Sequence, residues 1–198
     1  REKPASRTVH DLRLLLKDQM DLVDILIPRS AKVTTNFGTQ SIPAFIEETG
    51  FRQVILNLVI NARDAIERTG KIQISLKKVS KGQRIMKSAI GEKRLAPFEG
   101  AELALTDNGK GIPIEIQEKL FDPFVTTKTS GNGSGFGLYN TKVFIEDHNG
   151  LIGFATTEGK GTTFFLFIPL ESDEDENSVD YIKRTKRATR AFIKTKKN

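Results

Sequence analysis

The feature that most constrains this chain is a run of glycines at every second position, followed at once by a helical pattern. Gly131, Gly133, Gly135 and Gly137 stand in the segment 122–138, which reads DPFVTTKTSGNGSGFGL. Alternate glycines are unfavourable inside a strand or a helix, because glycine loses much conformational entropy on folding and packs no side chain. The segment is therefore predicted to be a loop, and the helix after it would present free N–H groups to an anion. A flexible surface loop is the alternative that this segment alone leaves open.

Length and composition indicate one folded domain with an appendage. The chain has 198 residues, no cysteine and a net charge of +6, and no apolar run approaches the length of a membrane span. The two histidines, His10 and His148, lack the spacing of a zinc site. We expect a frayed end over 1–8, a domain over 9–170, and an acidic-then-basic linker or tail over 171–198. The basic residues 183–197 could contact nucleic acid, but a tail that joins another domain is favoured, and no nucleic acid is expected.

Hydrophobic periodicity predicts alternating helices and strands along the domain. The clearest helix is 51–68, and the strand 162–170 is apolar on both faces, which favours a central place in its sheet. Residues 80–100 are polar and broken by glycine and proline, so they are expected to form a long loop or a hairpin. The other expected elements are helices over 12–26, 114–120 and 138–147, and strands over 31–37, 72–76, 103–107 and 152–154.

The helix over 51–68 carries a polar stripe beside its apolar one. Asn57, Asn61, Asp64 and Arg68 follow one another at helical spacing. Asparagine is a mediocre helix former, so two of them in this helix call for a reason. Hydrogen bonds between packed helices are one explanation. The other is an amide oxygen that helps to hold Mg²⁺ on phosphates, since Mg²⁺ prefers hard oxygen ligands and keeps few from the protein.

A second polar segment, DNGKGIP over 107–113, follows the predicted strand 103–107. Asp107 at the strand end could accept a hydrogen bond from an exocyclic amine such as that of adenine. The glycines after it would let a flat group lie against the backbone. An ordinary Asx turn before a helix is the alternative.

Taken together, the motifs resemble the catalytic domain of sensor histidine kinases, within the wider GHKL group of ATPases and kinases. NLVINARDA, DNGKGI, FDPFVTTK, GNGSGFGL and EGKGTTF occur in the order of that family's N, G1, F, G2 and G3 boxes. Their wording looks most like the nitrogen-regulation and hybrid-kinase branches. The resemblance implies an α+β fold of two layers, with a mixed, mostly antiparallel sheet of about five strands packed on about three helices.

The resemblance also implies roles at matching positions. Asn61 would hold Mg²⁺, with Asn57 as its partner one turn earlier, and Lys128 would reach phosphate, so these three form the implied catalytic set. Asp107 would read the adenine amine, and Phe121 and Phe124 would form the hinge of a nucleotide lid. The implied ATP-contacting residues are Asn61, Asp64, Asp107, Gly109, Gly111, Ile112, Phe121, Phe124, Thr127, Lys128, Gly133, Gly135, Phe136, Gly137, Leu138 and Thr162.

Two positions depart from the family pattern. At Asp64 many histidine kinases carry a lysine that contacts phosphate, and an aspartate there would repel the nucleotide unless turned away or neutralised. At Asn57 the hydrolytic members carry a glutamate base, and an asparagine cannot take a proton from water. This favours a kinase over the hydrolytic branches. A degenerate, non-catalytic nucleotide-binding or docking module is the alternative function, and Asp64 is the feature that favours it.

The same resemblance defines the expected partners. The γ-phosphoryl group of ATP would pass to a histidine on a separate dimerisation and phosphotransfer domain, and then to the receiver domain of a response regulator. His10 lies too close to the N box to be the acceptor. The parent protein is expected to be a homodimer, and this domain to be cytoplasmic, whether or not the parent has a membrane anchor.

Overall fold

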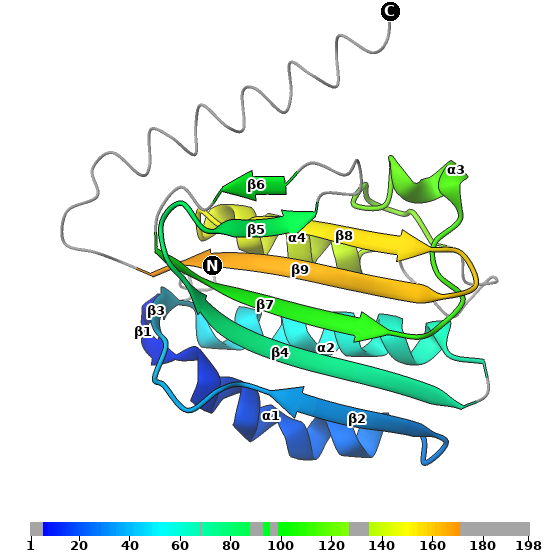
Figure 1. Ribbon diagram of the computed structural model, residues 1–198, viewed down its shortest axis with the longest axis horizontal. Helices are drawn as coiled ribbons and strands as arrows, with labels where there is room; N and C mark the ends of the chain where they lie inside the picture. The colour runs from blue at the N-terminus through cyan, green and yellow to red at the C-terminus, as the bar shows by residue number, and fades with distance from the viewer. Residues whose placement is uncertain (1–5, 68, 88–92, 96–98, 127–134, 171–198) are drawn as a thin grey trace, which may run out of the picture.

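A mixed five-stranded sheet forms one layer of the molecule, and three helices form the other (Figure 1). The computed structural model describes residues 6–67, 69–87, 93–95, 99–126 and 135–170. The sheet has the strand order β2-β4-β7-β9-β8, made by β2 (Ala31–Asn36), β4 (Gly70–Val79), β7 (Gly100–Asp107), β9 (Gly161–Pro169) and β8 (Leu151–Thr157). Only β2 and β4 pair in parallel, and the other three neighbouring pairs are antiparallel.

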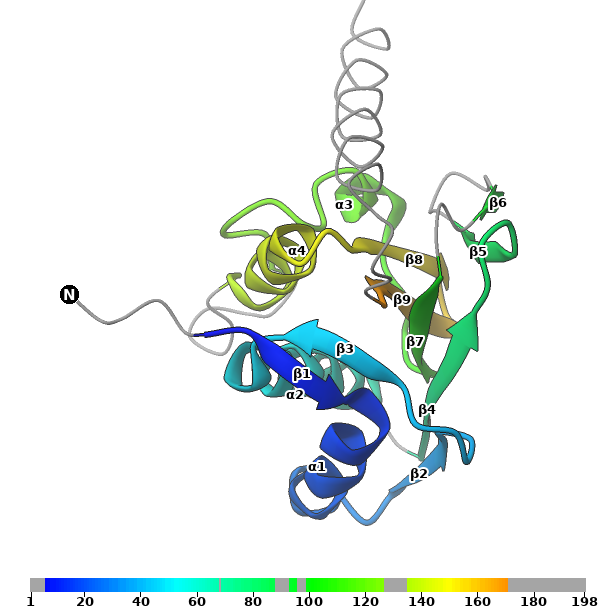
Figure 2. The ribbon, with the colours of Figure 1, turned by 90° about the vertical axis from the view of Figure 1, so that its left-hand side faces the viewer.

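Helices α1 (Leu12–Leu26), α2 (Glu48–Ala65) and α4 (Gly137–Asp147) cover one face of this sheet (Figure 2). The one-turn helix α3 (Ile114–Gln117) lies beyond the end of β8. The arrangement confirms the predicted α+β, two-layer fold with a mostly antiparallel sheet. Among the described residues, no helix is both long and apolar enough to cross a bilayer.

Strand β4 buries one of its two sides, as its alternating pattern predicts. Ile72, Ile74 and Leu76 are at most 3% exposed, while Lys71 and Gln73, which alternate with them, face solvent. Strand β9 lies between β7 and β8 and is apolar on both faces, as predicted for a central strand. On the face away from the helices, Phe167 is fully buried and its ring lies against Gly100 of β7.

Helix α2 begins earlier than its apolar stripe suggests, because Glu47 caps it. The Glu47 carboxylate accepts hydrogen bonds from the backbone N–H groups of Thr49, at 2.8 Å, and Gly50. This N-cap satisfies donors that the first turn leaves unpaired. The helix ends at Ala65, where Ile66 turns to extended backbone, three residues before the predicted end. Its buried stripe consists of Phe51, Val54, Ile55, Leu58, Val59 and Ala62.

Two short pairs of strands lie outside the main sheet. The segment predicted as a loop or hairpin contains β5 (Arg84–Lys87) and β6 (Lys93–Leu95), which pair in antiparallel fashion. A ribbon of β1 (Thr8–Asp11) and β3 (Pro43–Ile46) was not predicted. Each of its strands has only four residues, too few for alternation to stand out, although Ala44 and Ile46 are buried and Pro43 and Phe45 are exposed.

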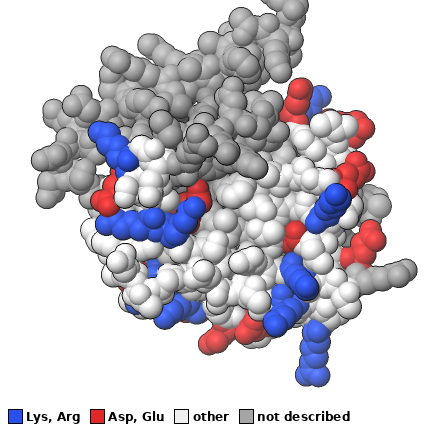
Figure 3. Space-filling view, viewed as in Figure 1, with Lys and Arg blue, Asp and Glu red and all other residues white. Residues whose placement is uncertain are grey.

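The sheet face away from the helices carries few charges at its centre. Figure 3 shows most Lys, Arg, Asp and Glu side chains of this view near the rim. Thr106 of β7 and Thr163 of β9 share a hydrogen bond of 3.0 Å between their hydroxyl oxygens there. One ion pair lies on the same face, between Lys77 and the buried carboxylate of Glu102, at 2.7 Å.

Candidate functional site

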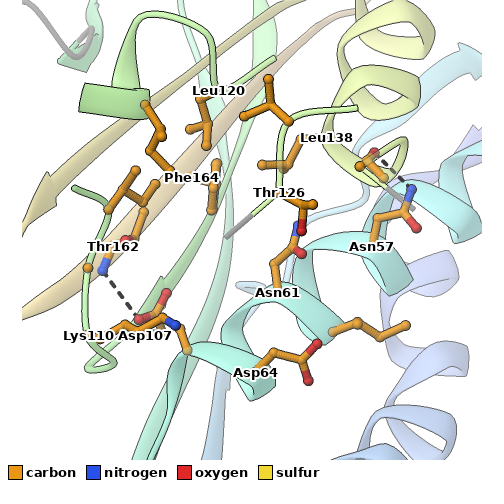
Figure 4. A pocket seen from close by; sticks show the side chains of 18 of the residues that line it. Asn57, Asn61, Asp64, Asp107, Lys110, Leu120, Thr126, Leu138, Thr162 and Phe164 are labelled. Atoms are coloured by element: carbon orange, nitrogen blue, oxygen red, sulfur yellow. Dashed lines mark hydrogen bonds between the residues drawn. The ribbon is translucent and has the colours of Figure 1, made fainter. Parts of the chain in front are cut away.

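A cavity of about 290 Å³ opens between α2, the loop after β7 and the start of α4 (Figure 4). This volume lies near the lower end of the range for small-molecule sites, about 300–1,000 Å³. All five predicted motif segments contribute described residues to its wall. The lining residues are Asn57, Ile60, Asn61, Asp64, Ala65, Asp107, Lys110, Gly111, Ile112, Pro113, Ile116, Leu120, Val125, Thr126, Gly135, Gly137, Leu138, Thr162 and Phe164.

Asp107 forms one end of the cavity, at the last position of β7. Its Oδ1 accepts hydrogen bonds from the backbone N–H groups of Gly109, at 2.8 Å, and Thr162, at 3.3 Å. The bond to Gly109 is the Asx turn that the sequence allowed, and it leaves the second carboxylate oxygen for a ligand. The other carboxylate oxygen points toward the cavity in Figure 4. Burial raises the pKa of Asp107, and hydrogen bonds from the backbone N–H groups of Gly109, Thr162 and Asp107 itself oppose that rise.

Close backbone packing around Asp107 explains two motif glycines. A Cβ on Gly109 would lie 2.5 Å from the carbonyl oxygen of Ala65 at the end of α2. A Cβ on Gly161 would overlap the Asp107 carbonyl, and Gly161 has a φ of +114°, which favours glycine. The ends of α2, β7 and β9 therefore meet in one fixed junction that holds the carboxylate.

Asn61 and Asn57 both line the cavity, but their surroundings differ. The Asn61 side chain points into the cavity (Figure 4), and it has no hydrogen-bond partner within the described part of the chain. Both polar atoms of the Asn57 amide are hydrogen-bonded: Nδ2 donates to the Gly137 carbonyl, at 3.1 Å, and Oδ1 accepts from Gln53, at 3.0 Å. Asn61 thus has an oxygen for a ligand, while Asn57 makes the helix-packing bond that the sequence left open as an alternative.

Asp64 lines the same wall, one turn beyond Asn61. Its Oδ1 accepts a hydrogen bond from Arg63 Nε and forms an ion pair with Arg63 Nη2, each at 2.8 Å. The sequence suggested that an aspartate here would repel a nucleotide unless it were turned away or neutralised. The structure pairs it with a neighbouring guanidinium, which offsets its charge at the cavity edge.

The start of α4 closes the opposite side. The residues that line the cavity there are Gly135, Gly137 and Leu138. The Thr141 hydroxyl donates a hydrogen bond of 2.8 Å to the Gly137 carbonyl. Thr162 of β9 lines it beside Asp107. The first turn of α4 thus faces the cavity with its N-terminal end, which favours negative charge.

The predicted aromatic residues lie around the cavity and do not line it. Phe121 packs edge-on against Phe154 of β8, with ring centres 5.9 Å apart. Phe124 is 71% exposed with a φ of +67°, and its ring lies 4.7 Å from that of Phe136, which precedes α4. Phe124 and Phe136 therefore join the two described ends of the glycine segment. Thr127, Lys128 and Gly133 lie outside the described residues.

Several lining residues were not predicted as site residues. Ile60, Ala65, Leu120 and Phe164 give the cavity an apolar wall, and Lys110 is the sole cationic side chain among its described lining. In the sequence, the apolar lining residues cannot be distinguished from ordinary core residues. Lys110 had a signal, since it stands between the two glycines of the 107–113 segment.

Comparison with known proteins identifies the family. A profile described as "Histidine kinase-, DNA gyrase B-, and HSP90-like ATPase" matches residues 46–172. The chain belongs to this family. It is 32% identical over 181 residues to "Sensory histidine kinase/phosphatase NtrB" of Rhizobium leguminosarum bv. phaseoli, covering 89% of the chain and 46% of that relative. It is 32% identical over 161 residues to "Sensor kinase CckA" of Brucella abortus, covering 81% of the chain and 17% of that relative.

Solved structures of family members share the fold. The catalytic domain of histidine kinase ThkA is 26% identical, with a TM-score of 0.61 over 83% of this chain and 95% of that one. The mycobacterial sensor histidine kinase MprB is 19% identical, with a TM-score of 0.65 over 82% of this chain and 97% of that one. The chain thus corresponds to the ATP-binding catalytic domain of sensor histidine kinases, and it spans less than half of the curated relatives named above.

Proposed function

We propose that this domain binds ATP with Mg²⁺ and, within its parent protein, transfers the γ-phosphoryl group to a histidine on a separate phosphoacceptor domain. The observation that carries the proposal is the placement of Asp107 and Asn61 on two walls of one cavity, with the first turn of α4 facing both. A purine nucleotide has an exocyclic amine at one end and phosphates at the other, which matches these groups.

The residues fit a divided task of reading the base and holding the phosphates. Asp107 would accept a hydrogen bond from the adenine amine, while guanine would present a carbonyl to the same carboxylate. The Asn61 amide oxygen suits Mg²⁺, which prefers hard oxygen ligands. When bound, the metal would neutralise phosphate charge. The N–H groups at the start of α4 and Lys128 of the glycine segment would stabilise the remaining negative charge.

Phosphoryl transfer in such a site depends on position and charge more than on protein acid-base chemistry. Asn57 cannot act as a base toward water, and its amide is bonded to Gly137 and Gln53. This supports transfer to an external acceptor over hydrolysis. A response regulator would then accept the phosphoryl group. ThkA has been solved in complex with its response regulator TrrA, which makes such a partner reasonable for this chain too.

Calorimetry with ATP, ADP and GTP, with and without Mg²⁺, tests the binding step. We expect ATP to bind more tightly than GTP, and Mg²⁺ to strengthen ATP binding. Phosphoryl transfer is then tested by adding a separate phosphoacceptor domain and [γ-³²P]ATP, and this chain alone should acquire no label at His10. Nucleotide binding without phosphohistidine on any acceptor would favour the non-catalytic docking module.

A further inference from the structure

His148 joins two helices at the end of α4 that lies away from the cavity. Its Nε2 accepts a hydrogen bond from the Glu47 backbone N–H at 3.2 Å, and its Nδ1 lies 2.8 Å from the Phe144 carbonyl. A carbonyl can only accept, so Nδ1 carries the proton and the imidazole is neutral. The ring is 9% exposed, and its centre lies 4.1 Å from that of Phe144.

Hydrogen bonds therefore connect helices α2 and α4 at both ends. Near the cavity, Asn57 of α2 bonds the carbonyl of Gly137, the first residue of α4. At the far end, His148 bonds Glu47, the N-cap of α2. Between these points the Phe144 ring packs so closely on Gly50 that a Cβ there would overlap it. Because α4 has 11 residues, these two hydrogen bonds are about 16 Å apart.

We propose that His148 is a positioning residue for nucleotide binding: as a neutral imidazole it holds the far end of α4 against α2. Its protonation releases that far end, so that α4 can pivot about the Asn57–Gly137 bond and change the direction of its first turn at the cavity. This inference rests on the function proposed above. It assigns a role to a residue that the sequence analysis considered only to exclude a zinc site.

Protonation removes the interaction directly, because a proton on Nε2 would point at the Glu47 N–H. The charged groups that act on the imidazole are Arg7 before β1, Glu47 at the start of α2 and Asp147 on α4. Glu47 cannot easily turn to the new charge, since its carboxylate already caps Thr49 and Gly50. Burial lowers the pKa of His148, although the Phe144 carbonyl and the two carboxylates oppose this. The imidazole is therefore neutral at neutral pH and keeps its hydrogen bond to the Glu47 N–H.

The test measures MgATP affinity by calorimetry at pH 7.5, 6.5 and 5.5 for the wild type, H148Q and H10Q. A glutamine at 148 can accept from the Glu47 N–H and does not titrate. His10 is the matched control, because it is the chain's other histidine and lies 3.7 Å from Glu48 at the same helix start. We expect the wild type and H10Q to lose about threefold to tenfold more affinity than H148Q between pH 7.5 and 5.5. Titration of the ATP phosphates affects all three proteins equally and cancels in the comparison.

An equal loss in all three proteins would overturn the proposal. If no protein binds nucleotide at any pH, the proposed function fails, and amide hydrogen exchange decides the positioning role by itself. The amides of 138–141 should then lose more protection on acidification in the wild type than in H148Q. If H148Q does not fold, NMR of H10Q, whose sole imidazole is His148, replaces it: the Glu47 and Gly137 amide shifts must follow the His148 titration, and shifts that ignore it refute the idea.

Discussion

Replacing Asp107 with asparagine changes one atom at the end of the cavity and tests how the base is read. The side chain is 4% exposed, and its Oδ1 accepts from the Gly109 and Thr162 N–H groups. An asparagine can keep both bonds through its remaining oxygen. Its amide nitrogen would then take the place of the oxygen that points to the cavity. Because that nitrogen and the adenine amine are both hydrogen-bond donors, no hydrogen bond could form between them.

The expected loss follows from the bond that is removed. A hydrogen bond to a charged group contributes about 1.5–3 kcal/mol, so ATP affinity should fall about tenfold to 150-fold. The fold should remain intact, because the pKa of buried Asp107 is raised in the folded state. Stability linked to such a group is greatest below its unfolded pKa and is lost as the pH rises through the folded value. A neutral amide avoids this loss, so D107N should unfold at the same or a higher urea concentration at pH 7.

Calorimetry with ATP and GTP on D107N and on D64N distinguishes base reading from a general charge effect. Asp64 is the matched control, since it is the other carboxylate of the described cavity lining. D107N should lose preference for ATP over GTP, because its amide can donate to the guanine carbonyl, while D64N should keep it. Unchanged ATP affinity in a folded D107N protein would refute the adenine-reading role, and an equal loss for both nucleotides would point to a distorted cavity.

Four further predictions follow from single contacts. N61A should weaken ATP binding about tenfold with Mg²⁺ and little with EDTA, and calorimetry that finds an equal loss in both would favour a packing role. R63A should weaken ATP binding several-fold and have less effect on adenosine, because it removes the guanidinium that pairs with Asp64 at the cavity edge; R63A/D64N should restore affinity if charge is the cause. Folding lowers the pKa of His148, so its contribution to stability is present above about pH 6.5, the ordinary value, and is lost as the pH falls through the folded value. Between pH 7.5 and 5.5, the free energy of unfolding measured in urea should therefore decrease more for the wild type than for H148Q. L103A should cost about 2–5 kcal/mol of unfolding free energy in urea, since Leu103 is 1% exposed at the centre of β7, and a cost below 1 kcal/mol would contradict its place in the core.

Local patterns in the sequence were sufficient to predict most of the fold. Alternation along β4 and the continuous apolar run of β9 are properties of a few neighbouring residues, so they can be read without knowledge of distant contacts. The order of the motifs indicated the family, and with it the mixed sheet. The β1–β3 ribbon was missed because pairing over 30 residues of separation stabilises strands too short to show a pattern.

The sequence determined which groups could serve a nucleotide, since the carboxyl of Asp107 and the amide of Asn61 are chemical properties of those residues. Only the tertiary structure decided how each group is used. Asn57 and Asn61 are identical side chains one turn apart, yet one bonds Gly137 and the other points into the cavity. The direction of a side chain depends on which distant element packs beside it, and here that element is α4, 80 residues further along the chain. The same cause turns His148 from an unremarkable helix-end residue into a link between two helices.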